Sequence, residues 1–205
     1  MTRLILASSS PSRRAILESA GVEPVVSPAN VDEERIQSEL GAHAAPEDVV
    51  ATLARAKATS VAQNFPADVV VGCDSMLLLD GQLLGKPHDP ATTVARWRAQ
   101  AGKTGELLTG HCVLGPNNQR YEEVARTDVH FADAKEEDII AYAQTGEPLE
   151  CAGAFTLEAL GGWFIDGISG DPSSVIGLSL PTVRHALYSM GLSVHHFWNR
   201  KPADA

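Results

Sequence analysis

The carboxylate of Asp74 has the position of a group that does chemistry. It directly follows Asp68–Cys73, a β-branched run that predicts a central strand. Sheets of the α/β class place their functional sites at the ends of such strands, and Gly72 permits close approach of another backbone. A carboxylate placed there can hold a divalent metal ion or activate a water molecule. The alternative is that Asp74 only begins the next turn.

Lys57 lies within a predicted helix, Pro46–Gln63. Helical spacing puts it on the same side as the apolar residues Val50, Leu53 and Val61, and not on the polar face. A lysine in such a position either extends along the apolar surface to solvent, which is the more common outcome, or projects into an internal polar site.

A serine-rich loop joins a predicted strand to the start of a helix. Ser8 and Ser10 precede Pro11, which suits the first position of a helix. Unpaired N–H groups at a helix start attract anions, and the serine hydroxyls add donors. Arg13 and Arg14 fall in the first turn, where the helix dipole disfavours cations by ~0.3–1 kcal/mol each. A bound anion would reverse that cost; the alternative, about equally common, is a capping serine beside two solvated arginines.

Lys86 adds a further cation beside a predicted hairpin. The hairpin comprises Met76–Leu79 and Gln82–Leu84, joined by an Asp-Gly pair that suits a two-residue primed turn. One acid accompanied by lysines and arginines from separate segments is what a polyphosphate site requires. The cations neutralise phosphate charge, and the carboxylate of Asp74 holds a metal ion or activates water.

Glu158 lies in a glycine-rich segment that could shape a base pocket. Gly153, Phe155, Gly161 and Gly162 surround it in the sequence. Glu158 would then accept hydrogen bonds from the edge of a base. From these residues alone, we favour the alternative of a β-hairpin with an exposed glutamate.

Strand and helix signals alternate along the chain, which predicts the α/β class. Strands are predicted at Arg3–Ala7, Val22–Val26, Asp68–Cys73, Leu107–Leu114 and Tyr121–Phe131, with a strand–turn–strand over Cys151–Ile168. Helices are predicted at Ser10–Gly21, Pro46–Gln63, Asp89–Ala101, Glu136–Gln144 and Pro181–Met190, and Ala29–Ala45 is expected to be irregular.

Composition excludes several classes of protein. The 205 residues are 44% hydrophobic, enough for the core of one domain, 1–205, and the net charge of −10 argues against a protein that coats nucleic acid. No apolar run approaches the ~18–20 residues that span a membrane, and the N-terminal run is too short for a secretion signal. We therefore expect a cytoplasmic protein that binds neither membranes nor nucleic acid. The three cysteines lack the spacing of a zinc site or a disulfide framework.

Taken together and in order, these segments resemble the Maf family of nucleoside triphosphate pyrophosphatases, also called septum formation inhibitor proteins. The resemblance runs from Leu4 to about Leu187. The motifs that carry it are Leu6–Arg14, Val31–Glu34, Leu53–Ala58, Val71–Ser75, Leu84–Pro87, Thr109–Gly110, Gly146–Leu149, Cys151–Phe155 and Gly177–Pro181. Each motif is weak alone, and the ordered set is specific.

The resemblance implies a fold and a reaction. The fold is α/β, an elongated twisted mixed sheet flanked by helices, with two lobes around a central cleft (Maf/ITPase-like), often as a homodimer. The reaction is hydrolysis of a nucleoside triphosphate to the monophosphate and pyrophosphate with a divalent cation, Mg²⁺ or Mn²⁺, in house-cleaning of the nucleotide pool.

The resemblance also implies roles for residues of this chain. Asp74 matches the catalytic proton acceptor, and Lys57 and Lys86 act with it. Ser8 and Arg13, with the neighbouring Arg14, are expected to bind the phosphates. Glu33 and Asp74 are expected to hold the metal ion, and Glu158 matches a base-side position.

Three questions stay open at this level. The base preference lies between 7-methyl-GTP-like and dTTP/UTP-like: Cys151 and Glu158 resemble the first branch, but Ser12 replaces a larger residue of that branch. A nucleotide-binding regulator of cell division and septum formation, acting through a partner, is the alternative function. A phosphomonoesterase with Asp74 as nucleophile ranks last, because Ser75-Met76 follows Asp74 where such enzymes usually have a DxD pair.

Overall fold

The computed structural model describes residues 2–199, so the ends of the expected 1–205 domain lie outside the described residues. These residues form two compact units. Within the described residues, the first comprises 2–74, 109–125 and 177–199, and the second comprises Ser75–Leu108 and Arg126–Ile176. The cleft between two lobes stays a prediction. No helix within residues 2–199 has both the length and the apolar character needed to cross a membrane.

Seven strands of the described chain form one mixed sheet, which confirms the α/β class. Their order is β2-β1-β3-β5-β6-β7, and β4 pairs with β3. The strands are β1 (Leu4–Leu6), β2 (Val25–Val26), β3 (Val69–Leu79), β4 (Gln82–Leu84), β5 (Thr104–Leu114), β6 (Arg120–Phe131) and β7 (Ile165–Ser169). The β1–β2 and β1–β3 pairs are parallel, whereas β3–β4 and β6–β7 are antiparallel.

Three helices of the first unit come from its N-terminal segment, and the first two have side-chain caps. They are α1 (Pro11–Ser19), α2 (Glu33–Leu40) and α3 (Pro46–Ala62). Ser10 caps α1 by accepting from the N–H of Arg13, as the Ser-Pro pair predicted. The prediction of an irregular Ala29–Ala45 was wrong. Asp32 caps α2, whose two large apolar residues, Ile36 and Leu40, are four apart and half-buried. Two apolar positions in a short polar helix are a weak periodic signal.

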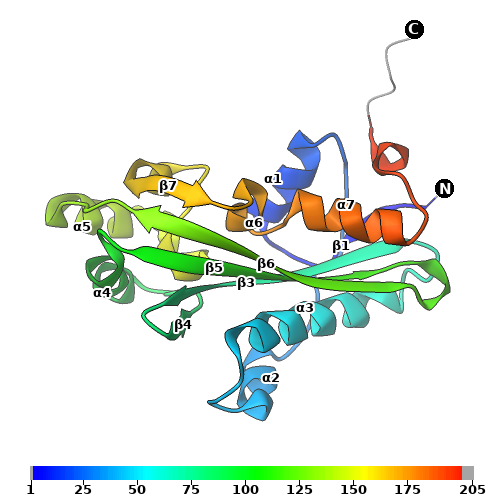
Figure 1. The fold of residues 1–205 in the computed structure, drawn as a ribbon, viewed down its shortest axis with the longest axis horizontal. Helices are drawn as coiled ribbons and strands as arrows, with labels where there is room; N and C mark the ends of the chain where they lie inside the picture. Colours follow the sequence, from blue (N-terminus) through cyan, green and yellow to red (C-terminus); the bar gives the residue numbers. More distant parts are fainter. Residues whose placement is uncertain (1, 200–205) are drawn as a thin grey trace, which may run out of the picture. The chain divides into compact units, whose positions relative to one another are not determined.

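Helix α3 packs unusually close to the sheet. A Cβ atom on Gly72 would lie 2.4 Å from the carbonyl oxygen of Ala54, and one on Gly110 would lie 2.3 Å from that of Val50. Glycine on two strands therefore lets the helix backbone contact the strand backbones directly. Figure 1 shows α3 along one face of these strands, with α1 and α7 (Leu180–Ser189) on the other.

The second unit has an aromatic core around Trp97. The Trp97 side chain is fully buried, its indole N–H donates to the carbonyl of Ala154 over 2.7 Å, and Phe131, Tyr142 and Phe164 meet its ring at steep angles. The helices here are α4 (Pro90–Gln100), α5 (Glu136–Gln144) and α6 (Pro172–Ile176). Such edge-to-face packing fixes ring orientations as well as burying area.

Two loops of the second unit test the turn predictions. The Asp80-Gly81 turn has positive φ at both residues, as a primed turn requires, and Leu79 pairs with Gln82. The strand–turn–strand expected over Cys151–Ile168 was wrong. This segment instead forms 3₁₀ turns until β7 begins at Ile165, and Gly153, with φ of 68°, breaks the extended conformation.

Candidate active site

Asp74 is a buried carboxylate directed at helix α3. It follows Gly72 by two residues on β3, so both side-chain positions face the same side of the sheet, the side that α3 covers. Asp74 is 6% exposed, and its Oδ1 lies 2.6 Å from the Nζ of Lys57. Its Oδ2 has no hydrogen-bond partner among the described residues. One oxygen is therefore held by a cation, and the other keeps its accepting capacity.

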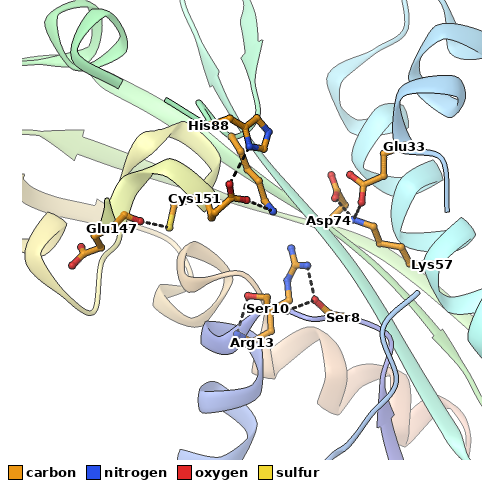
Figure 2. A network of polar contacts seen from close by, with 11 residues as sticks. Ser8, Ser10, Arg13, Glu33, Lys57, Asp74, His88, Glu147 and Cys151 are labelled. Atoms are coloured by element: carbon orange, nitrogen blue, oxygen red, sulfur yellow. Dashed lines mark hydrogen bonds and ion pairs between the residues drawn. The ribbon is translucent and has the colours of Figure 1, made fainter. Parts of the chain in front are cut away.

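Lys57 projects into an internal polar site and does not extend to solvent. It is 8% exposed, on the buried stripe of α3 that also carries Leu53 and Val61, as the helical spacing predicted. Its Nζ lies 2.8 Å from a carboxylate oxygen of Glu33 as well as 2.6 Å from Asp74. Figure 2 shows both carboxylates pointing toward this amine. The buried ammonium is thus paired with acidic groups and needs no contact with water.

Burial and charge act in opposite directions on Asp74. Burial raises the pKa of its carboxyl above the ordinary value, and the positive charges of Lys57 and Arg13 partly oppose this rise. A carboxylate with a raised pKa is a stronger proton acceptor than an exposed one. The surroundings of Asp74 therefore suit a general base.

The serine-rich loop and Arg13 form a second set of polar groups in the same unit. The hydroxyl of Ser8 accepts hydrogen bonds from the N–H of Ser10 and from Nη1 of Arg13, each over 3.2 Å. Nε of Arg13 donates to the carbonyl of Gly177 over 2.7 Å.

The predicted strand end at Cys73 was wrong, because β3 continues to Leu79 and Asp74 lies inside it. Because β1 is parallel to β3 and ends opposite Val71, the loop that follows β1 lies beside the part of β3 that carries Asp74. This placement agrees with the electrostatics, because the charge of Arg13 lowers the pKa of Asp74.

Arg14 differs from Arg13 in its placement. It forms an exposed ion pair with Glu18, one helical turn further along α1, over 2.6 Å. Its role in phosphate binding stays a prediction.

Lys86 and Glu158 belong to the second unit. The amine of Lys86 lies 3.2 Å from one carboxylate oxygen of Glu150, and the imidazole of His88 lies 3.1 Å from the other. These three side chains are more than half exposed. Glu158 is exposed too, and its carboxylate accepts the N–H of Leu157. The structure thus pairs Asp74 with Lys57 and Glu33, and describes Lys86 and Glu158 in a separate group.

Sequence reasoning assigned no role to Glu147, which organises the glycine-rich loop. Its carboxylate accepts hydrogen bonds from the hydroxyls of Tyr142 and Thr156 and from the N–H groups of Leu160 and Gly161. Burial alone would raise the pKa of Glu147, but these hydrogen bonds lower it below the ordinary value. The signal in the sequence was the Gly146–Leu149 motif, which was noted without a function for its acid.

The donor set around Lys57 fits a small divalent cation. Asp74 and Glu33 are two carboxylates that both contact the Lys57 amine, and Oδ2 of Asp74 has no hydrogen-bond partner among the described residues. Mg²⁺ is usually held by one or two carboxylates, with waters and substrate phosphates completing the coordination. No group of three or more acidic, histidine or cysteine ligands occurs in the described part of the chain. The residues present therefore suit an ion shared with a phosphorylated ligand.

Comparison with known proteins agrees with the sequence motifs. The family model described as Maf-like protein matches residues 3–190. A protein of Corynebacterium aurimucosum is 66% identical over 196 residues, covering 96% of this chain and 98% of the relative, and one of Corynebacterium efficiens is 61% identical over 199 residues, covering 97% and 100%. Both are named nucleoside triphosphate pyrophosphatase.

A likeness to one solved structure is weaker. The Ham1 protein of Staphylococcus aureus shares 14% identity with a TM-score of 0.44, covering 64% of this chain and 73% of that chain. The family assignment rests instead on the model match and on the relatives, which cover nearly the whole chain at high identity. This chain belongs to the Maf family.

Proposed function

We propose that this chain is a nucleoside triphosphate pyrophosphatase, which hydrolyses its substrate to a nucleoside monophosphate and pyrophosphate. The observation that carries the proposal is the buried Asp74, held at Oδ1 by Lys57 and unpartnered at Oδ2 among the described residues. The names of the relatives at 61–66% identity support the same reaction. Membership of the family would not by itself say which side chain of this structure accepts the proton.

Asp74 is the proposed general base. A water molecule attacks the α-phosphorus, Asp74 accepts its proton, and the bond from the α-phosphorus to the bridging oxygen breaks. The electron pair of that bond leaves with pyrophosphate. Burial gives the carboxylate its basicity, and Lys57 keeps it ionised and fixes its orientation.

Arg13 and Ser8 bind the phosphates in this proposal. They follow β1, beside the part of β3 that carries Asp74. Lys86, whose ammonium is exposed, keeps the phosphate-binding role that the sequence predicted for it. The leaving pyrophosphate develops negative charge, which pre-oriented cations stabilise more strongly than water does. Arg14 is proposed to add to this charge from the outer side of α1.

Glu33 and Asp74 would hold a divalent cation, Mg²⁺ or Mn²⁺. When bound, such an ion neutralises phosphate charge and helps to orient the substrate. The chain's own contribution is to hold both carboxylates beside the same amine, that of Lys57.

The preferred base, the homodimer and the cytoplasmic location stay predictions from the sequence. Glu158 is the proposed base-side residue, and its exposure leaves it accessible to a ligand. A preference for either 7-methyl-GTP-like or dTTP/UTP-like substrates is compatible with this placement. A role as a regulator of septum formation remains the alternative.

A nucleotide panel tests the proposal. Purified protein with Mg²⁺ or Mn²⁺ is given canonical and methylated purine and pyrimidine triphosphates, and pyrophosphate and orthophosphate are measured separately. We expect pyrophosphate from at least one nucleotide, and a loss of about 10²–10⁴-fold in kcat for Asp74→Asn.

The matched control is Asp80→Asn, the same chemical change at an exposed turn residue that pairs with Lys103. We expect it to keep wild-type turnover. Equal inertness of wild type and Asp74→Asn across the panel would overturn the enzymatic proposal and favour the regulator. Release of orthophosphate alone would favour a phosphomonoesterase.

A further inference from the structure

His111 is a buried histidine to which neither the motifs nor the proposed chemistry assigns a task. It lies on β5 beside Gly110 and is 1% exposed. Strand alternation directs it away from α3, because Gly110 faces that helix. Its Nε2 accepts the N–H of Ser179 over 2.8 Å, so the ring proton is on Nδ1. Nδ1 has no hydrogen-bond partner among the described residues.

The contact of His111 anchors a short segment that also contacts Arg13. Ser179 is the N-cap residue of α7, and its hydroxyl accepts the N–H of Thr182. Two residues earlier, the carbonyl of Gly177 accepts Nε of Arg13 over 2.7 Å. Gly177 has φ of 127°, a conformation that side chains rarely adopt. The segment 177–179 is therefore fixed at one end by the imidazole and presents a carbonyl to the guanidinium at the other.

Burying the imidazole has an energetic cost, and the contact with Ser179 offsets part of it. A leucine would fill the same position without burying an unpaired N–H group, which costs about 1–3 kcal/mol. Burial, and then the charge of Arg13, lower the pKa of His111 to about 4, so the ring is neutral at physiological pH. Its Nε2 can therefore accept a hydrogen bond at physiological pH.

We propose that His111 is a positioning residue for Arg13: it holds the 177–179 segment so that the Gly177 carbonyl directs the guanidinium toward Ser8 and the phosphate-binding loop. This inference rests on the proposed function, which gives Arg13 a phosphate to bind. His111 itself touches no substrate in this arrangement.

A double-mutant cycle between His111 and Arg13 tests the proposal. The variants are His111→Leu, Arg13→Met and the pair, and the readouts are KM and kcat for the best nucleotide of the panel. Affinity for inorganic tripolyphosphate is measured separately. We expect His111→Leu to raise KM and weaken tripolyphosphate binding about tenfold, as the loss of one charge-assisted hydrogen bond does, with a smaller change in kcat. In the Arg13→Met background, His111→Leu should change affinity by less than about twofold, because its effect passes through Arg13.

Conservative variants separate positioning from folding. In His111→Gln the amide oxygen can replace Nε2 as acceptor, and we expect it to restore most of the affinity. His111→Asn ends short of Ser179 and should behave as His111→Leu does. Ser179→Ala removes the capping hydroxyl but keeps the N–H that His111 accepts. It should lower the melting temperature without weakening tripolyphosphate binding.

Several outcomes would overturn the inference. One is an equal effect of His111→Leu with and without Arg13, and another is wild-type affinity in a folded His111→Leu or His111→Asn. If His111→Leu does not fold, the His111→Asn cycle gives the same decision. Failure of the proposed function can be told apart from failure of this inference. If the wild type releases no pyrophosphate, the coupling between His111 and Arg13 can still be measured by tripolyphosphate binding.

Discussion

The two charged clusters of this molecule have similar chemistry and opposite surroundings. In the first unit, Lys57 lies between Asp74 and Glu33, and both Lys57 and Asp74 are almost inaccessible to water. In the second unit, Lys86 and His88 share the exposed carboxylate of Glu150. The first cluster is desolvated and fixed by helix packing, and the second is hydrated and free to exchange partners.

This difference indicates that the two clusters suit different steps of the proposed reaction. A buried ion pair has its geometry set before any ligand arrives, and its charges act in a low dielectric. An exposed pair contributes only about 0–1 kcal/mol to stability, so a phosphate can replace its carboxylate at little cost. The buried cluster therefore suits proton transfer, and the exposed cluster suits reversible binding.

The largest expected effect comes from breaking the buried cluster with Lys57→Met. Turnover should fall by about 10²–10⁴-fold, because Asp74 loses the cation that orients it and keeps it ionised. Without that cation, the pKa of Asp74 rises further, so the acid limb of the kcat/KM profile should move to higher pH. The measurement is a pH–rate profile of wild type and variant.

The stability of Lys57→Met should also depend on pH. The folded state raises the pKa of Asp74, so its protonated form favours folding, and this advantage is lost as pH rises through the folded pKa. The variant should therefore lose melting temperature relative to wild type as pH rises. Lys103→Met, which breaks the exposed pair with Asp80, is the control and should show neither effect. An unmoved acid limb in Lys57→Met would contradict the role given to Lys57.

The second largest effect should come from displacing α3 with Gly72→Ala. The added Cβ would overlap the Ala54 carbonyl, and a backbone atom cannot rotate away as a side chain can. We expect a stability loss of ~1–3 kcal/mol and reduced turnover, because a shifted α3 separates Lys57 from Asp74. Thermal and urea unfolding measure the stability loss, and the pyrophosphate assay measures the turnover.

Gly85→Ala is the matched control for the Gly72 variant. A Cβ atom on Gly85 would meet nothing within 4 Å, and its φ lies outside the left-handed region. We expect a stability change within about 0.5 kcal/mol. Equal losses in the two alanine variants would show that close packing of α3 is not what Gly72 provides.

The smallest effects belong to the exposed cluster. Glu150→Gln removes the carboxylate that occupies Lys86, so KM for the nucleotide should fall about two- to fivefold, with a stability change of about 0.5 kcal/mol or less. Lys86→Met should raise KM and lower turnover while leaving the melting temperature unchanged. Steady-state kinetics at low and high salt provide the check, since added salt should shrink both effects. A large loss of stability in either variant would contradict the claim that the exposed cluster contributes little to stability.

Local signals in the sequence predicted much of the fold. Ser10-Pro11 and Asp89-Pro90 gave correct helix starts, because capping depends on a few adjacent atoms. Asp80-Gly81 gave the hairpin for the same reason. One failure was α2, a short helix with only two large apolar residues. The other was the run of 3₁₀ turns near Gly153, where the hydrogen bonds of Glu147 with Thr156 and Gly161 replace strand pairing.

The sequence by itself determined the kinds of groups present and the side of α3 on which Lys57 lies, since helical spacing is a local property. The contacts of Lys57 with Asp74 and Glu33, and its burial from solvent, are visible only in the folded molecule. That outcome depends on how closely α3 approaches the sheet at Gly72 and Gly110. Contacts between distant segments depend on the packing of whole elements, which no local pattern encodes.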